Sequence, residues 1–336
     1  MINQSPYLHM SAPLNLDTQN QKYWGQALES LSIPSNDDPY EVLLTYAPEI
    51  AREFVPAELL QEVVSIKQPS TRPYRLLNNL PRDSQLMGVP TDGKRPSWKK
   101  SWVSESVLIG IAGALGLNPL SYLQEKEGAL VHEVAPISGQ QRQLSNCGKV
   151  ALGFHTDHAI LHRRYRPEYL MLIGLVNPGN VPTLIACIDD ALERLEPHHE
   201  KVLQQHRFRV ELPDSVSVWN GKKLLSEWKP MLTTGNNGVV EFSGNLHSVR
   251  PMDEEAANAL SALVAILAQV AQEIVLKPGM LVLFDNHRCL HARRSVYRER
   301  WLQRLFCRHS LTDLRQRNAA LASSSYAFDM QALLLE

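Results

Sequence analysis

The chain has 336 residues, of which 44% are hydrophobic and 21% are charged, and its formal net charge is −1. This composition is typical of a globular enzyme and gives no electrostatic basis for binding nucleic acid or an anionic membrane, so we expect a small-molecule partner. The sequence shows no signal-peptide pattern and no apolar run of membrane-spanning length, which predicts a cytoplasmic protein, and it indicates no oligomeric state.

The first third of the chain is predicted to be mainly helical. Apolar residues recur at helical spacing over residues 39–65 and again over residues 103–117. A stretch rich in Pro, Arg and Asp, residues 68–100, separates these two segments. We therefore expect residues 1–120 to form a helical part that packs on the core of a single domain spanning residues 1–336.

The remainder of the chain is predicted to be rich in β-strands. Short apolar runs such as ALVHEVAPI, EYLMLIGLV, TLIACI and GMLVLF alternate with turn residues, as is typical of strands. One helix is predicted over residues 253–273, with Asp253 as its N-cap and an apolar face that would cover the outside of a sheet. The pattern predicts an α+β, β-rich fold with flanking helices, in which residues 121–315 form a jelly-roll core and residues 316–336 a C-terminal tail.

A candidate metal site lies in the sequence Gly-Phe-His-Thr-Asp-His. On a strand, residues two apart point to the same face, so His155 and Asp157 can present an imidazole and a carboxylate to one ion while Thr156 points away. His158 is out of phase with both ligands on a regular strand, and we expect it to be a surface or neighbouring residue. Because H-x-D is common by chance, the site requires a third ligand from elsewhere.

Two histidines further along the chain are candidates for that third ligand. Residues 277–286 (KPGMLVLFDN) predict a turn and a buried strand that leads to His287 and His291. His291 is favoured because Asp285-Asn286 marks the end of the strand and His291 opens the next segment. Two imidazoles and one carboxylate leave positions open on iron(II) for an oxo acid and O₂. A catalytic zinc ion can use the same donors, so a zinc-dependent hydrolase is an alternative.

Two arginines follow these histidines in the sequence Arg-Trp-Leu-Gln-Arg. The even spacing of Arg300 and Arg304 places both on one face of a strand. A guanidinium group binds a carboxylate bidentately, and an oxo-acid cosubstrate and an amino-acid substrate each carry one. A zinc hydrolase has no need of such a pair. A non-catalytic binding barrel is a further alternative, but it is disfavoured because every predicted ligand is present.

In their order, these motifs resemble the clavaminate synthase-like branch of the iron(II)/2-oxoglutarate oxygenases, which includes hydroxylases of free arginine, asparagine and lysine. The resemblance spans residues 76–311 and rests on LGFHTDHA, PTLIA, LKPGMLVLFDNHRCLHAR and RWLQR. It implies a distorted double-stranded β-helix and a facial triad of His155, Asp157 and His291. It also implies that the protein uses iron(II), 2-oxoglutarate and O₂.

The same resemblance implies roles for residues around the metal. Arg300 and Thr183 would bind 2-oxoglutarate, and Arg304 would bind the α-carboxylate of the substrate. Asp157 stands where amino-acid hydroxylases carry Glu, and its presence argues against a halogenase, which lacks this carboxylate. Positions near the backbone polar groups of the substrate are Gln124, Glu125, Ser145 and Asn146.

The identity of the substrate depends on the residues that face its side chain. The guanidine-binding relatives carry acidic residues in a segment where this chain has Ser243 and Asn245, which disfavours arginine. Candidates for binding a lysine ammonium or an amide are Glu133, Glu241, Asn245 and His132. We therefore predict hydroxylation of an unactivated C–H bond of a free polar L-amino acid, with conversion of 2-oxoglutarate to succinate and CO₂. The best candidate is L-lysine, and the alternatives are arginine, asparagine, citrulline or a carrier-bound amino acid.

Overall fold

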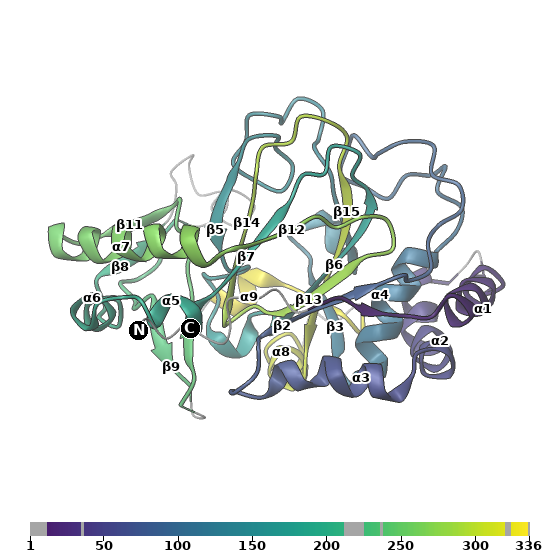
Figure 1. Ribbon diagram of the computed structural model, residues 1–336, viewed down its shortest axis with the longest axis horizontal. Helices are drawn as coiled ribbons and strands as arrows, with labels where there is room; N and C mark the ends of the chain where they lie inside the picture. Colours follow the sequence, from purple (N-terminus) through teal and green to yellow (C-terminus); the bar gives the residue numbers. More distant parts are fainter. Residues whose placement is uncertain (1–11, 35–36, 212–224, 236–237, 320–323, 335–336) are drawn as a thin grey trace.

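Two β-sheets stacked face to face form the centre of the molecule (Figure 1). The structure is a computed structural model that describes residues 12–34, 37–211, 225–235, 238–319 and 324–334. The larger sheet has the spatial order β1 (Leu14–Asn15), β2 (Tyr74–Asn78), β13 (Leu281–Asp285), β6 (Tyr169–Val176), β15 (Trp301–Arg308), β3 (Asn118–Tyr122) and β16 (Ala327–Phe328), and β4 (Val131–Val134) also pairs with β15. The smaller sheet has the order β12 (Gln272–Ile274), β7 (Thr183–Cys187), β14 (Cys289–Arg293) and β5 (Leu152–His155). Two separate strand pairs are β8 (Phe208–Val210) with β11 (Val249–Pro251) and β9 (Leu232–Thr234) with β10 (Val240–Phe242).

The side chains of strand β15 pack into two different hydrophobic cores, one on each face of the larger sheet. Alternate side chains of a strand point to opposite faces, and both faces of β15 are buried. Trp301 and Leu305 pack with the N-terminal helices, whereas Leu302 and Phe306 pack toward the smaller sheet. The space between the sheets is therefore reached by every second residue of β15, including Arg304.

A helical layer covers the outer face of the larger sheet, as predicted for the first third of the chain. It consists of α1 (Thr18–Glu29), α2 (Pro39–Phe54), α3 (Ala57–Val64) and α4 (Val103–Ala114). The predicted helical segment 39–65 is divided at Val55-Pro56, because proline lacks an N–H group and disfavours the helical conformation of the residue before it. Helices α2 and α4 approach closely at Gly110, where a Cβ atom would lie 2.8 Å from the carbonyl oxygen of Ala47.

A buried ion cluster anchors the segment between α3 and α4. The Nζ atom of Lys99 lies 2.9 Å from the carboxylate of Asp83 and 2.6 Å from that of Glu105, and all three side chains are almost completely buried. Removing one partner of a buried ion pair leaves an uncompensated charge and costs about 3 kcal/mol or more. We expect Lys99→Met to lower the free energy of unfolding by roughly 3 kcal/mol, measured by urea titration.

The matched control for this variant is Lys94→Met. Lys94 pairs with Glu127 at 2.6 Å, but both side chains are largely exposed. An exposed ion pair contributes little because water solvates its charges. The urea midpoint of Lys94→Met should equal that of the wild type, and an equal loss in both variants would contradict a role for the buried cluster.

The smaller sheet is covered on its outer face by α7 (Glu254–Val270). Leu263 and Leu267 of this helix pack with Ala186 of β7 and Leu290 of β14, and the carboxylate of Asp253 caps the helix by accepting from the N–H of Ala256. The N-cap at Asp253 is as predicted, but the helix ends at Val270 and residues 272–274, which were expected to include its end, form β12. The other helices are α5 (Ile188–Leu192), α6 (Pro197–Leu203), α8 (Thr312–Arg317) and α9 (Met330–Leu334). Among the helices described, none combines the length and apolar character needed to cross a membrane.

Candidate active site

The three predicted metal ligands meet at the inner face of the smaller sheet. In the pairing of β5 with β14, His155 lies directly opposite His291, and Asp157 follows two residues after the end of β5. Oδ1 of Asp157 lies 3.4 Å from Nε2 of His155 and 3.7 Å from Nε2 of His291, and one donor atom from each residue falls within 4.8 Å of the others. Metal–ligand bonds of about 2.1 Å place neighbouring donors roughly 3 Å apart. The three donors therefore fit a single ion after a small inward movement.

The alternative ligand His287 lies elsewhere. Its buried ring faces Glu241, with Nδ1 3.8 Å from the carboxylate. The structure therefore selects His291 from the two candidates. The ring of His155 is oriented by a contact of 2.9 Å between its Nδ1 and the carbonyl oxygen of Gly153, which leaves Nε2 directed at the metal position.

The protonation states of the ligands suit a divalent cation. Burial opposes ionisation of Asp157, but Arg304, His291 and His155 together hold the pKa of its carboxyl well below the usual range. Burial, followed by the nearby charge of His155, lowers the pKa of His291 to about 3. The site thus offers an anionic oxygen and a neutral imidazole nitrogen, the forms that bind metal.

Arg304 connects the metal site to a second carboxylate. Its Nη1 donates to Oδ2 of Asp157 at 2.7 Å, and its Nη2 donates to Oε2 of Glu125 at 3.0 Å. Nδ1 of His132 lies 2.8 Å from the same Nη2, and burial followed by Arg304 lowers the pKa of His132 to about 3. His158 lies 3.5 Å from the Glu125 carboxylate and its ring is 4.3 Å from that of Tyr122. His158, which was expected to be a surface or neighbouring residue, lines the cavity next to the ligands because β5 ends before it.

Asn286 holds the loop that carries Asp157. Its side-chain oxygen accepts from the N–H of Asp157 at 2.9 Å, and its amide donates to the carbonyl oxygens of Asp157 and Pro167, both at 3.0 Å. Asn286 is completely buried. The sequence analysis assigned this residue only to the end of a strand, because nothing in the sequence indicates that its amide reaches a loop more than a hundred residues away.

Arg300 and Thr183 lie together, as the cosubstrate prediction requires. Nη2 of Arg300 donates to Oγ1 of Thr183 at 2.8 Å, while its buried Nε has no hydrogen-bond partner. Arg300 is 3% exposed, and in the described part of the chain no carboxylate pairs with it. Burial, followed by the charge of Arg293, lowers the pKa of Arg300 to about 9. A buried guanidinium without a counter-ion is stabilised by a ligand carboxylate, so the pair fits an oxo dicarboxylate.

A cavity of about 170 Å³ is lined by two of the three ligands, His155 and Asp157. It brings together the predicted residues Glu125, Ser145, Asn146, Asn245 and Arg304. The cavity is also lined by residues that the sequence analysis did not single out, namely Leu144, Leu152, Ile160, Val210, Glu211 and His247. Nothing in their local sequence marks these residues, because they come from separate segments that only the fold brings together.

Five of the residues predicted to contact the substrate do not line this cavity, namely Gln124, His132, Glu133, Glu241 and Ser243. Glu133 points to the opposite face of β4 from His132 and accepts hydrogen bonds from Trp301 and Gln303. The amide of Gln124 pairs with Asp329 at 2.6 Å. The hydroxyl of Ser243 accepts from Lys229 at 2.7 Å and lines an adjacent cavity. The carboxylate of Glu241, another lysine-binding candidate, is occupied by Arg163.

The position of Glu133 predicts a pH effect on stability and no effect on substrate binding. Burial, followed by the charge of Glu105, raises the pKa of Glu133 to about 7. The folded protein therefore binds more protons than the unfolded chain between the ordinary glutamate pKa and about 7, and stability falls as pH rises through this interval. Glu133→Gln should remove part of this fall, as measured by urea titration across the interval, while the KM for the amino acid stays within twofold. A large rise in KM would place Glu133 in the binding site.

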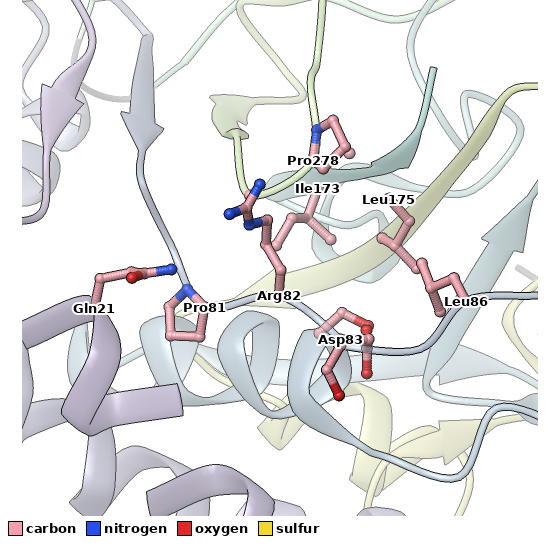
Figure 2. Close-up of a pocket in the computed structure, with 12 residues that line it drawn as sticks. Gln21, Pro81, Arg82, Asp83, Leu86, Ile173, Leu175 and Pro278 are labelled. Carbon is pink, nitrogen blue, oxygen red and sulfur yellow. The ribbon is translucent and has the colours of Figure 1, made fainter. Parts of the chain in front are cut away.

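A further cavity of about 360 Å³ lies on the helix-covered side of the larger sheet (Figure 2). Gln21 of α1, Arg82, and Ile173 and Leu175 of β6 line it. Ile173 and Leu175 belong to the core shared with the N-terminal helices, so the sheet separates this cavity from the metal ligands. None of the three ligands lines it.

Residues 109–306 match the family model described as taurine catabolism dioxygenase TauD, TfdA family. The L-asparagine oxygenase of Streptomyces coelicolor is 30% identical over 281 residues, which cover 81% of each chain. Clavaminate synthase 2 of Streptomyces clavuligerus is 28% identical over 269 residues, which cover 76% of this chain and 78% of the relative. A solved structure of asparagine oxygenase with Fe(II), 2S,3S-3-hydroxyasparagine and succinate has a TM-score of 0.79 and 26% identity over 94% of this chain and 99% of that chain.

Proposed function

The chain belongs to the TauD/TfdA family of iron(II)- and 2-oxoglutarate-dependent dioxygenases. We propose that it hydroxylates an unactivated C–H bond of a free polar L-amino acid. The observation that carries the proposal is the contact between Arg304 and Glu125 beside Asp157, at the wall of the metal-site cavity. An α-amino acid carries a carboxylate and an ammonium on neighbouring atoms. A guanidinium next to a carboxylate is complementary to both groups.

Each part of the site then has a defined task. His155, Asp157 and His291 would hold the iron, and Arg300 with Thr183 would bind the distal carboxylate of 2-oxoglutarate. When bound, iron, 2-oxoglutarate and O₂ supply the oxidation that inserts one oxygen atom into the C–H bond and releases succinate and CO₂. The protein supplies position, because the reacting bond is selected by where Arg304 and Glu125 fix the amino acid. No side-chain acid or base is required.

Arg304 must exchange partners when the substrate binds. In this structure its two Nη atoms are bonded to Asp157 and Glu125, so an incoming α-carboxylate would share or replace one of these contacts. The low pKa of the Asp157 carboxyl keeps it ionised throughout. We infer that iron binding makes Arg304 available to the substrate, because a cation shared by Asp157, His155 and His291 weakens the ion pair between Asp157 and Arg304.

We propose that the side chain of the substrate faces Asn245, Asn146 and Glu211, which also line the cavity. Glu211 replaces Glu133 and Glu241 as the acidic candidate, and it lies 3.5 Å from Arg250. We propose L-lysine as the first candidate substrate, with its ammonium directed toward Glu211. Asparagine is the principal alternative, because amide groups of Asn245 and Asn146 complement a carboxamide and a relative is an asparagine oxygenase. The remaining candidate substrates are arginine, citrulline and a carrier-bound amino acid.

The fold is consistent with the same proposal. We propose that the two stacked sheets are the distorted double-stranded β-helix, or jelly roll, of this family, and that residues 1–336 act as one oxygenase domain. In support, a single apolar cluster joins Trp24 and Val107 of the helices to Met171 and Leu305 of the larger sheet.

The experiment that tests the function is a substrate panel. Protein loaded anaerobically with iron(II) and 2-oxoglutarate is exposed to air with each proteinogenic amino acid and citrulline, and succinate and the mass of the amino acid are measured. We expect one amino acid to stimulate succinate formation and to gain one oxygen atom. Failure of every free amino acid, together with normal 2-oxoglutarate binding, would overturn the free-substrate proposal and favour a carrier-bound one.

A further inference from the structure

A larger cavity adjoins the metal-site cavity and is not used in the proposed reaction. Its volume is about 730 Å³, and Ala159 and Ile160 line both cavities. The polar side chains at its wall include Arg166, Lys229 and Ser243. Because the two cavities share part of their walls, a ligand in the larger one lies next to the active site.

Arg166 is a buried cation with unmet hydrogen-bonding capacity. It is 4% exposed, and its Nε and Nη1 atoms are buried without a hydrogen-bond partner. Burial is the largest cause that lowers its pKa to about 10, and Arg163 and Arg308 act in the same direction against Glu241. Leaving charged donors unpaired in the interior is costly. Arg300, which faces the predicted 2-oxoglutarate position, shows the same combination of burial and an unpartnered Nε.

Lys229 is a second cation at the same wall, and it is half-buried. Its Nζ donates to the carbonyl oxygen of Ala159 at 2.6 Å and to the hydroxyl of Ser243 at 2.7 Å, and both acceptors are neutral. Burial, followed by the charge of Arg166, lowers its pKa to about 7. Within the described ranges, no carboxylate lies at ion-pair distance from this ammonium.

The carboxylates nearby are already engaged with other cations. Glu241, which also lines this cavity, accepts from Nε and Nη2 of Arg163, and its carboxylate lies 3.8 Å from Nδ1 of His287. Glu168 pairs with Arg308 at 3.1 Å. In the described part of the chain, Arg166 and Lys229 therefore have no carboxylate at ion-pair distance, although the charge of Glu241 acts on Arg166 from farther away.

We propose that this cavity is an anion-binding subsite in which Arg166 and Lys229 hold a carboxylate or phosphate group. An anion would satisfy the open guanidinium positions of Arg166 and stabilise the protonated form of Lys229, which no residue at this wall does. The group could belong to a free small anion, or it could be the anionic end of a substrate that extends past Ala159 and Ile160.

The subsite is tested by calorimetric titration of the full chain with inorganic sulfate at mildly acidic pH, where Lys229 is charged. We expect saturable binding of one sulfate per chain, weakened at least tenfold in Lys229→Met and in Arg166→Met. Lys201→Met, on the exposed surface of α6, is the matched control and should bind as the wild type does. Circular dichroism establishes whether each variant is folded. If Arg166→Met is unfolded, the comparison of Lys229→Met with the wild type is sufficient to test the subsite.

Arg300→Met distinguishes this subsite from the 2-oxoglutarate position, because sulfate binding that survives this substitution cannot depend on Arg300. A competition experiment distinguishes the two sources of the anionic group, a substrate and a free small anion. An acidic amino acid that displaces sulfate identifies a substrate-borne group, whereas simultaneous binding of sulfate and amino acid identifies a separate anion. The proposal is overturned by an absence of saturable sulfate binding, by equal affinity in wild type and Lys229→Met, or by loss of binding in Arg300→Met. None of these results bears on whether the enzyme oxidises an amino acid.

Discussion

Asp157→Asn should reduce iron-dependent succinate formation about a thousandfold and should lower the iron content of the protein. Asparagine removes the anionic ligand and places an amide against Nη1 of Arg304, whose remaining carboxylate partner is Glu125. Breaking a buried ion pair costs about 3 to 5 kcal/mol, and 1.4 kcal/mol corresponds to a factor of ten. Metal analysis after loading and initial rates of succinate formation measure the two effects separately.

The matched control for Asp157→Asn is Glu273→Gln. Glu273 also pairs with an arginine, Arg294, but the two side chains are 48% and 62% exposed and lie away from the metal ligands. Its substitution should leave iron content and turnover unchanged, because the partner charge remains solvated. Wild-type iron content and turnover within threefold in Asp157→Asn would show that Asp157 is not a ligand.

Arg300→Met should raise the KM for 2-oxoglutarate at least a hundredfold while the KM for the amino acid changes little. Truncating one partner of a buried, hydrogen-bonded charge pair costs about 2 to 5 kcal/mol, and Arg300 is 3% exposed with an unpartnered Nε directed to the proposed carboxylate position. The measurement is the initial rate of succinate formation as a function of 2-oxoglutarate, with the amino acid saturating. Thr183→Val removes a single neutral hydrogen bond of about 1 kcal/mol, so its KM should rise only about fivefold.

Arg294→Met provides the control for Arg300→Met, because Arg294 lies in the same connection between β14 and β15 but is exposed. Both KM values should be unchanged in this variant. Equal effects on the two KM values in Arg300→Met would indicate a general disturbance of the site and would contradict a specific role in cosubstrate binding.

Local sequence patterns predicted the elements and ligands whose geometry is local or is set by strand periodicity. The H-x-D spacing predicted that His155 and Asp157 serve one ion, and the structure brings them together with His291. The even spacing of Arg300 and Arg304 predicted a shared face of one strand, but Arg300 directly precedes β15, where it is buried beside Thr183, and only Arg304 lies within β15. Asp157 likewise follows the end of β5, so the spacing identified the ligands although the regular strand ends at His155.

The residues that line the far end of the cavity could not be predicted in this way. Glu133 was a candidate because it is acidic and near the right motif, yet its neighbour His132 takes the inward position and Glu133 faces the helices. A one-residue difference in strand phase reverses the side of the sheet that a residue faces, and sequence alone does not fix that phase. Glu211 and Asn286 reach the site through tertiary contacts between distant segments, for which their local sequence contains no signal.

The most direct test of the account is an oxidation in oxygen-18 gas with iron(II), 2-oxoglutarate and the amino acid selected by the substrate panel. The account predicts one labelled oxygen atom in succinate and one in the amino acid, with equal amounts of the two products. Loss of both products in Asp157→Asn would tie the reaction to the metal site. Labelled succinate without a labelled amino acid, or amino-acid oxidation that does not consume 2-oxoglutarate, would contradict the proposed hydroxylation.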